Sequence, residues 1–471
     1  MRERSFSVLG DLAAGRPLLV SSVIAIGLAA LTASAFRGAP ASFASVGYSY
    51  LAALAVMTTA PAAIASMAPR NVWLRLFYSG VAAGLILAVR RIAIQSGFEP
   101  ASFSVDIAFA GAAIVTGALS LCAPLWRGAL RLAVVGLCAV TLGAAGGLSI
   151  IALEAARSGA VPAAGAALGF SAAIGAAFCV FLANVYCAEF SGGAGGAVAA
   201  ARAVRAISAP ALLSVCLAIV ALGAGAFLAG MPLQSAAYVG AGVMAVGLVA
   251  SILMGAAALA LKAPTEMTAI EENRRRAGLA PLLRALRATA PPSTSIAASA
   301  ILLIATVVTG FDAASAASLA EIVIIAAAFA VALVAFVSVR SALLLVIMLI
   351  VGTRLSLWGA ERLLAEAPAE NVRVIAAALA AVIYSHIVLA WRDNRSPRRK
   401  ALDVTGRAIA DSASSYAAAS VLAAAALASA DAAGLWEAGS EAALFTAAVL
   451  LVGAASAPVL MTAMGAVFGR E

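Results

Sequence analysis

Charged residues are scarce in this sequence. Asp, Glu, Lys and Arg make up 11% of its 471 residues, only one histidine is present, and 64% of the residues are hydrophobic. The mean hydropathy is correspondingly high, at +1.07. A soluble domain needs far more polar side chains to face water. The composition therefore excludes a water-soluble globular protein and indicates that lipid surrounds most of the chain.

Recognisable chemical motifs are also lacking. The five cysteines have no CxxC spacing, so no disulfide framework or zinc site is indicated: Cys122, Cys138, Cys179, Cys187 and Cys216. We expect them to be small buried apolar side chains. No nucleophile elbow, paired carboxylates or phosphate-binding GxxxxGK[ST] loop occurs. The sequence therefore predicts no catalytic residue, no metal, no cofactor and no enzymatic activity.

Long apolar segments dominate what remains. About fourteen of them approach or exceed the ~20 residues that cross a bilayer as a helix. They are solidly apolar, whereas barrel strands would alternate, so helices are expected. We read the first as an uncleaved span rather than a signal peptide, although arginines precede it. The predicted fold class is all-α, a polytopic membrane bundle with spans near 17–36, 48–68, 75–95, 105–125, 130–154, 163–187, 208–231, 236–262, 294–311, 318–338, 341–360, 371–391, 413–431 and 440–467.

The basic residues collect in alternate loops. With the N-terminus inside, the inside loops contain clusters such as 274–276 and 398–400, whereas the outside loops are mostly acidic, as at Glu361, Glu366 and Glu370. Lys and Arg favour the cytoplasmic side. We therefore expect a multi-pass protein of a bacterial-type inner (plasma) membrane with both termini cytoplasmic. The net charge of +9 is thereby explained without nucleic acid as a partner.

An internal repeat is suggested by matching positions. His386 follows Asn184 by 202 residues, and Arg407-Ala408-Ile409 follows Arg205-Ala206-Ile207 by the same offset. Each pair frames an inside loop between two spans. Parallel repeats are related by an axis along the membrane normal. The predicted organisation is an N-terminal segment with two helices (1–74), a first six-helix repeat (75–262), a basic cytoplasmic linker (263–293) and a second six-helix repeat (294–471).

Four stretches of the second half resemble the transmembrane scaffold of the resistance-nodulation-division (RND) superfamily, including its MMPL-type lipid exporters. They are Phe336–Ser341, Tyr384–Asp393, Ala401–Tyr416 and Pro458–Leu460. The resemblance implies a transporter scaffold. Two departures accompany it. The outside loops are too short for the family's porter domains. The positions of its proton-relay acids fall near Val180 and Val382, which cannot ionise.

Charged and polar residues inside or at the ends of spans are the candidate functional residues. A charge at the bilayer centre costs about 2.5–3.5 kcal/mol on insertion scales. Such residues are therefore expected to bind substrate or lipid, or to form ion pairs: Arg90, Arg91, Asp106, Asn184, Glu321, Arg354 and His386.

Each candidate has alternative interpretations. Arg90 and Arg91 either pair with Asp106 or Glu99, bind a lipid phosphate, or extend to the headgroups. Arg354 either extends to the headgroups, binds an anionic lipid or pairs with an acid such as Glu321. His386 either titrates near neutral pH or makes a helix-packing hydrogen bond, as its repeat partner Asn184 would.

The expected function is transport or flipping of a lipidic or amphipathic substrate, reached laterally from the bilayer. Short loops and few intramembrane charges favour an apolar ligand over ions or sugars. Two alternatives stay open. One is a non-transporting scaffold or accessory subunit of a larger membrane complex. The other is a 14-helix polysaccharide-lipid flippase. The expected partners are membrane lipids and, for the scaffold, other membrane proteins.

Overall fold

The structure is a computed structural model that describes residues 15–38, 41–69, 71–97, 103–122, 127–158, 165–191, 193–207 and 401–450, with isolated positions between 359 and 380. Every regular element within these residues is a helix, which confirms the all-helical prediction over this part of the chain. The spans expected near 208–231, 236–262, 294–311 and 318–338, with most of those near 341–360 and 371–391, lie outside the described residues. The total of about fourteen therefore stays a prediction.

The described helices overlap predicted spans, although the helix at Ala41–Leu54 begins before the span near 48–68 and the helix at Ala401–Ala432 begins before the span near 413–431. Their bounds are α2 Pro17–Gly38, α3 Ala41–Leu54, η1 Ala55–Thr59, α4 Ala60–Ala65, α5 Val72–Gln95, α6 Phe103–Cys122, α7 Arg127–Ser158, α8 Gly165–Ser191 and α18 Ala401–Ala432. Further helical residues lie at 196–207 and 439–450. Among the described residues, five helical stretches are long and apolar enough to cross a membrane. The protein is therefore a multi-pass membrane protein.

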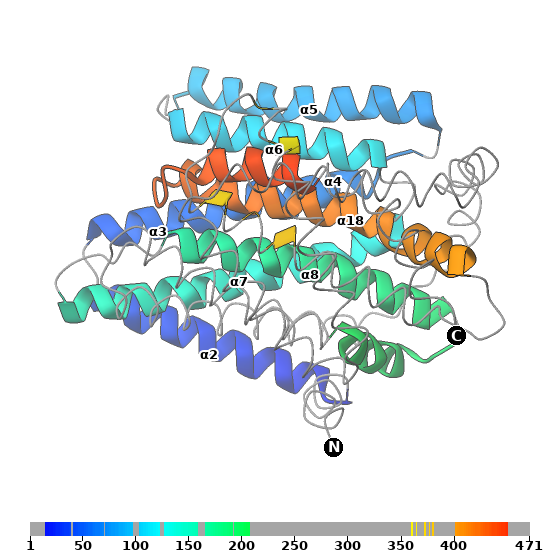
Figure 1. Cartoon of the computed structure of the whole chain (residues 1–471). Coiled ribbons are helices and arrows are strands. Elements are labelled where there is room, and N and C mark those ends of the chain that lie inside the picture. Colours follow the sequence, from blue (N-terminus) through cyan, green and yellow to red (C-terminus); the bar gives the residue numbers. More distant parts are fainter. Residues whose placement is uncertain are drawn as a thin grey trace, which may run out of the picture.

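The helices lie side by side and alternate in direction (Figure 1). At one face of the bundle, the end of α2 contacts the end of α7. A Cβ added at Gly38 would lie 3.7 Å from Ala156 Cβ. At the opposite face, Arg75 Nη1 on α5 donates to the Leu121 carbonyl near the end of α6, at 2.9 Å. Successive loops therefore fall on opposite faces, as a chain that crosses a membrane repeatedly requires.

The two faces differ in charge. Outside 359–380, the side chains described at the face where α2 begins include Arg16, Arg75, Arg131, Arg202 and Arg205 with the single acid Glu189. We call this the basic face. The opposite, mixed face has Arg37, Arg90, Arg91 and Arg157 with Asp106, Glu154, Asp431, Glu437 and Glu441. This asymmetry is the one that the positive-inside rule uses; assignment of the basic face to the cytoplasm stays a prediction.

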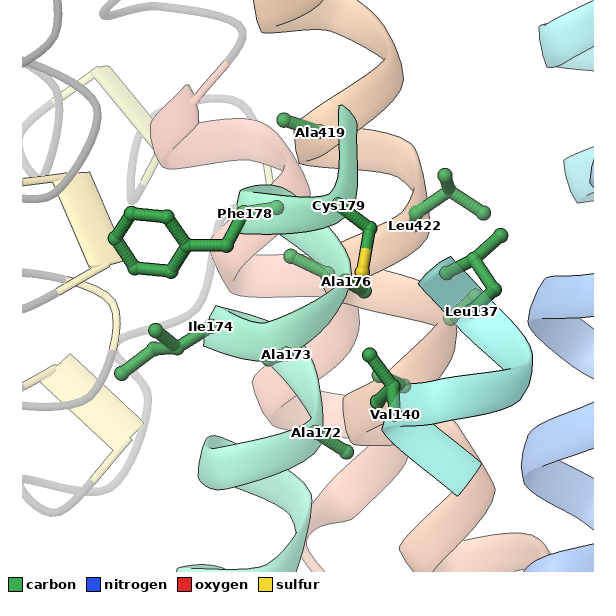
Figure 2. Close-up of a cluster of buried hydrophobic side chains, with 14 of the residues drawn as sticks. Leu137, Val140, Ala172, Ala173, Ile174, Ala176, Phe178, Cys179, Ala419 and Leu422 are labelled. Carbon is green, nitrogen blue, oxygen red and sulfur yellow. The ribbon is translucent and has the colours of Figure 1, made fainter. Parts of the chain in front are cut away.

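Helix α8 forms the centre of the described bundle, between α7 and α18. In its most apolar window 94% of the residues are buried, against 17% in α5. Small residues permit this enclosure. A Cβ added at Gly136 of α7 would lie 2.7 Å from Cys179 Sγ. Figure 2 shows Cys179 of α8 among Leu137 and Val140 of α7 and Leu422 of α18. The expectation that the cysteines are buried is confirmed for Cys179 and Cys187 and is wrong for Cys138, which is exposed.

The second N-terminal span contains a π-helical turn that the sequence reading did not predict. Within η1, the Ala60 N–H donates to the Ala55 carbonyl, five residues back. Pro61 follows and has no N–H to continue the α-helical ladder, which accounts for the irregularity at this point. Met57 of η1 packs against Gly111 of α6, where an added Cβ would meet its methyl group. This N-terminal helix is thus part of the same bundle as α6.

Candidate functional site

Helices α5 and α6 form an antiparallel pair at the edge of the bundle (Figure 1). Asn71 starts α5 by accepting a hydrogen bond from the Trp73 N–H at 2.9 Å, the usual N-cap arrangement. In the middle of the pair, Ser79 Oγ donates to the Gly117 carbonyl at 3.1 Å. At the mixed face, Arg90 contacts Asp106. With the Arg75 contact at the basic face, polar contacts fix the register along the whole length of the pair.

The ion pair between Arg90 and Asp106 is the main feature of the site. Arg90 Nε donates to Asp106 Oδ1 at 2.8 Å, and the two side chains are 5% and 51% exposed. The Arg90 guanidinium carbon also lies 6.0 Å from the centre of the Phe109 ring, within cation–π range. Asp106 lies in the first turn of α6, where the helix dipole favours a negative charge. A buried arginine is therefore satisfied at the end of an apolar helix.

Arg91 takes the opposite direction. Successive residues of a helix project about 100° apart, so when Arg90 faces α6, Arg91 falls on the outer side of α5, where it is exposed. Among the described residues, none forms an ion pair or hydrogen bond with Arg91. Two adjacent arginines thus differ sharply: one is neutralised within the helix pair and the other faces the surroundings.

The rest of that outer side is apolar. The exposed large side chains of α5 are Trp73, Leu74, Leu76, Phe77, Val81, Leu85, Leu87, Val89 and Ile92. The buried stripe, which includes Ser79, Ala82 and Arg90, faces α6. In a multi-pass protein, such an apolar outer face can contact lipid or the helix of a partner protein. The ion pair and Arg91 therefore lie at the end of a helix whose outer side is exposed and apolar.

Asn184 lies elsewhere. It is partly exposed on α8, towards the basic face, and Arg90 and Asp106 are at the mixed face. No Asp, Glu, Lys, Arg or His occurs in α8 before Glu189, which pairs with Arg202 at 3.1 Å. Val180, where the RND resemblance would place a proton-relay acid, is 3% exposed. The other candidates, Glu321, Arg354 and His386, lie outside the described residues.

Several polar contacts between helices were not singled out from the sequence. The buried Tyr50 hydroxyl of α3 donates to the Leu168 carbonyl of α8 at 3.2 Å. Ser149 Oγ of α7 donates to Thr32 Oγ1 of α2 at 3.1 Å. The Tyr186 hydroxyl on α8 is buried and has no partner among the described residues. The signal for the two contacts was available, since hydroxyl groups in apolar spans commonly bond across helices.

A metal site is not evident in the described part of the chain, where no three His, Cys, Asp or Glu side chains gather suitably. The residues brought together at the mixed face are instead a cation, a carboxylate and an aromatic ring, with a second cation beside them. Such a set can hold a zwitterionic or anionic headgroup by charge-assisted hydrogen bonds.

Comparison with known proteins gives no family assignment. No family model matches the chain, and no curated protein matches it. Among solved structures, SecDF, described as a translocon-associated membrane protein from Thermus thermophilus, matches with a TM-score of 0.48 at 13% identity, over 74% of this chain and 62% of that chain. SecDF in a super-membrane-facing form matches with a TM-score of 0.46 at 12% identity, over the same shares. The chain thus spans under two thirds of either structure, and TM-scores below 0.5 leave the RND resemblance a prediction.

Proposed function

We propose that this protein binds a lipidic or amphipathic substrate at the α5–α6 edge and moves it between leaflets. The observation that carries the proposal is the Arg90–Asp106 ion pair, with a 5% exposed arginine side chain on a helix whose outer side is apolar. The pair lies at one end of both helices and its carboxylate is half exposed, where a charged headgroup can bind it by charge-assisted hydrogen bonds. This access favours a functional role for the pair.

The geometry suits a substrate that enters from the side. Asp106 is half exposed, so its carboxylate is accessible to a headgroup that slides along the mixed face. The acyl tails of the substrate would remain in contact with the apolar side of α5. They would therefore need no water-filled path through the protein. Because α8 has no charged residue along most of its length, the centre of the described bundle offers little to an ion or a sugar.

Proton coupling through α8 is not included in the proposal. The RND resemblance would place a titrating acid near Val180, and that residue is a buried valine. Substrate movement would then follow its concentration gradient or be driven by a partner protein.

A lipid-movement assay tests the proposal. The full chain is reconstituted in vesicles with a fluorescent phospholipid, and the fraction accessible to an external quencher is followed with time. We expect movement above that in protein-free vesicles, and loss of it in the double variant Arg90→Gln/Asp106→Asn, which removes both charges and leaves neither unpaired. The matched control is Arg202→Gln/Glu189→Gln at the opposite face. Equal rates with and without protein would reject the function.

A second candidate is a non-transporting scaffold or accessory subunit of a membrane complex. It is favoured by the exposure of two apolar helices, since only 17% of the residues in the most apolar windows of α2 and α5 are buried. Such faces accept either lipid or partner helices. Gentle purification distinguishes the candidates, because a stoichiometric protein partner would support the scaffold.

A further inference from the structure

We propose that the outer side of α5 binds one anionic phospholipid, with the lipid phosphate on Arg91 and an acyl chain along Gly80, Gly84 and Ala88. The site concerns a resident lipid. It uses the same outer side of α5 that the proposed function gives to the substrate tails, but its test requires no movement of a substrate.

The shape of the helix supports an acyl chain. Gly80, Gly84 and Ala88 follow each other at four-residue spacing and therefore lie in one row, and Arg91 continues that row one turn later. All four are exposed. A Cβ added at Gly80 or Gly84 would have no atom within 4 Å. Large exposed side chains lie beside the row, including Leu85, at 60% exposed. The small residues therefore form a shallow groove between larger apolar side chains, which we call the lane.

The length of the lane fits one leaflet. Gly80 and Arg91 are eleven positions apart, which corresponds to ~16 Å at the helical rise of about 1.5 Å per residue. Half of the ~30 Å hydrocarbon core is about 15 Å. A lipid whose phosphate contacts Arg91 would therefore have its tail end near Gly80, close to the middle of the bilayer.

The charge identifies the headgroup. Arg90 is neutralised by Asp106, whereas Arg91 has no ion-pair partner among the described residues. A phosphate that carries a net negative charge neutralises such an arginine, and a zwitterionic headgroup does so less completely. A partner helix could also fill a lane of small residues, but it would have to present a carboxylate to Arg91. A lipid is the occupant that both fits along the row of small residues and neutralises Arg91.

Lipid retention by the purified full-length protein tests this. Native mass spectrometry measures binding of phosphatidylglycerol and of phosphatidylcholine to the wild type, Arg91→Gln, Gly84→Leu and the control Arg157→Gln. Arg157 is also an exposed arginine at the mixed face, but the bulky Leu153 and the acid Glu154 lie one turn below it. Gly84→Leu should fold, because the position is open and leucine favours a helix over glycine.

We expect Arg91→Gln to weaken phosphatidylglycerol binding about fivefold, the factor for ~1 kcal/mol per arginine at an anionic surface, and to weaken phosphatidylcholine binding by a smaller factor. Gly84→Leu should weaken the binding of both lipids, and Arg157→Gln of neither. An unchanged preference for phosphatidylglycerol in Arg91→Gln would overturn the proposal. The proposal would also be overturned if the wild type were a dimer, or were bound to a stoichiometric partner protein, and this complex dissociated in Gly84→Leu. These readouts require no lipid movement, so they stand apart from the transport assay.

Discussion

Two glycines with opposite surroundings should respond in opposite directions to the same substitution. At Gly165, where α8 begins, an added Cβ would lie 2.7 Å from the Leu435 carbonyl carbon and 3.2 Å from Trp436 Cβ. The first obstacle is backbone, which cannot rotate away as a side chain can. At Gly84 of α5 the same methyl group would meet nothing within 4 Å. The pair therefore separates packing from intrinsic helix preference.

The expected magnitudes follow from these contacts. Overpacking costs ~1–3 kcal/mol, and a rigid carbonyl group places Gly165→Ala at the upper end. Its position at the first residue of the helix allows little compensation from the preference of alanine for helix. Gly84→Ala lies in a helix interior, where alanine is favoured over glycine by up to ~1 kcal/mol. We expect Gly165→Ala to lower the free energy of unfolding by about 2–3 kcal/mol and Gly84→Ala to leave it equal or raise it.

The assay is reversible unfolding of the purified protein in mixed micelles with increasing denaturing detergent, followed by circular dichroism. Gly84→Ala is the matched control, because it makes the same chemical change in the same chain. The reasoning fails if Gly165→Ala is as stable as the wild type, or if the two variants lose equal stability. Either result would mean that α8 does not lie against the 433–438 turn as closely as the structure places it.

Three further predictions concern the polar contacts. Tyr50→Phe should lower the free energy of unfolding by about 0.5–1.5 kcal/mol, because it deletes a hydrogen bond between helices. Tyr186→Phe should leave stability unchanged or raise it in the same denaturation assay, because its hydroxyl has no partner among the described residues; a larger loss than for Tyr50→Phe would contradict both assignments. Arg90→Gln should lower the thermal midpoint more than Arg91→Gln, because only the former deprives Asp106 of its partner, and the double variant Arg90→Gln/Asp106→Asn should recover part of the loss. Equal midpoints for the two single variants would show that the ion pair is not formed.

The helix positions were predictable because they depend on local sequence. A segment long and apolar enough to cross the bilayer must form a helix, and the expected span at 17–36 corresponds to α2 at Pro17–Gly38. The π turn at Ala55–Thr59 was not predicted. Pro61 alone signals a disturbance in the helix, but the form of the disturbance depends on how Met57 packs against α6.

Burial was less predictable than position. Helices α5 and α8 are both strongly apolar, yet one lies at the edge of the bundle and the other at its centre. An apolar helix is as suitable for contact with lipid as for a protein interior, so hydropathy cannot distinguish a helix at the edge of the bundle from one at its centre. The richness of α8 in glycine and alanine was a usable signal for close packing. The roles of Arg90 and Arg91 were likewise left open by the sequence, since their difference arises only when α6 is placed beside α5.

The arrangement of helices in the bilayer is the basis for every proposal above, and a lipid-borne carbene label tests it directly on the unmodified protein. The full chain is reconstituted with a phospholipid that has a diazirine in its acyl chain, irradiated, and digested for mass spectrometry. We predict heavy labelling of α5, at residues such as Phe77, Leu85 and Ile92, and protection of α8 around Ile174. Labelling of α8 as heavy as that of α5 would contradict the account.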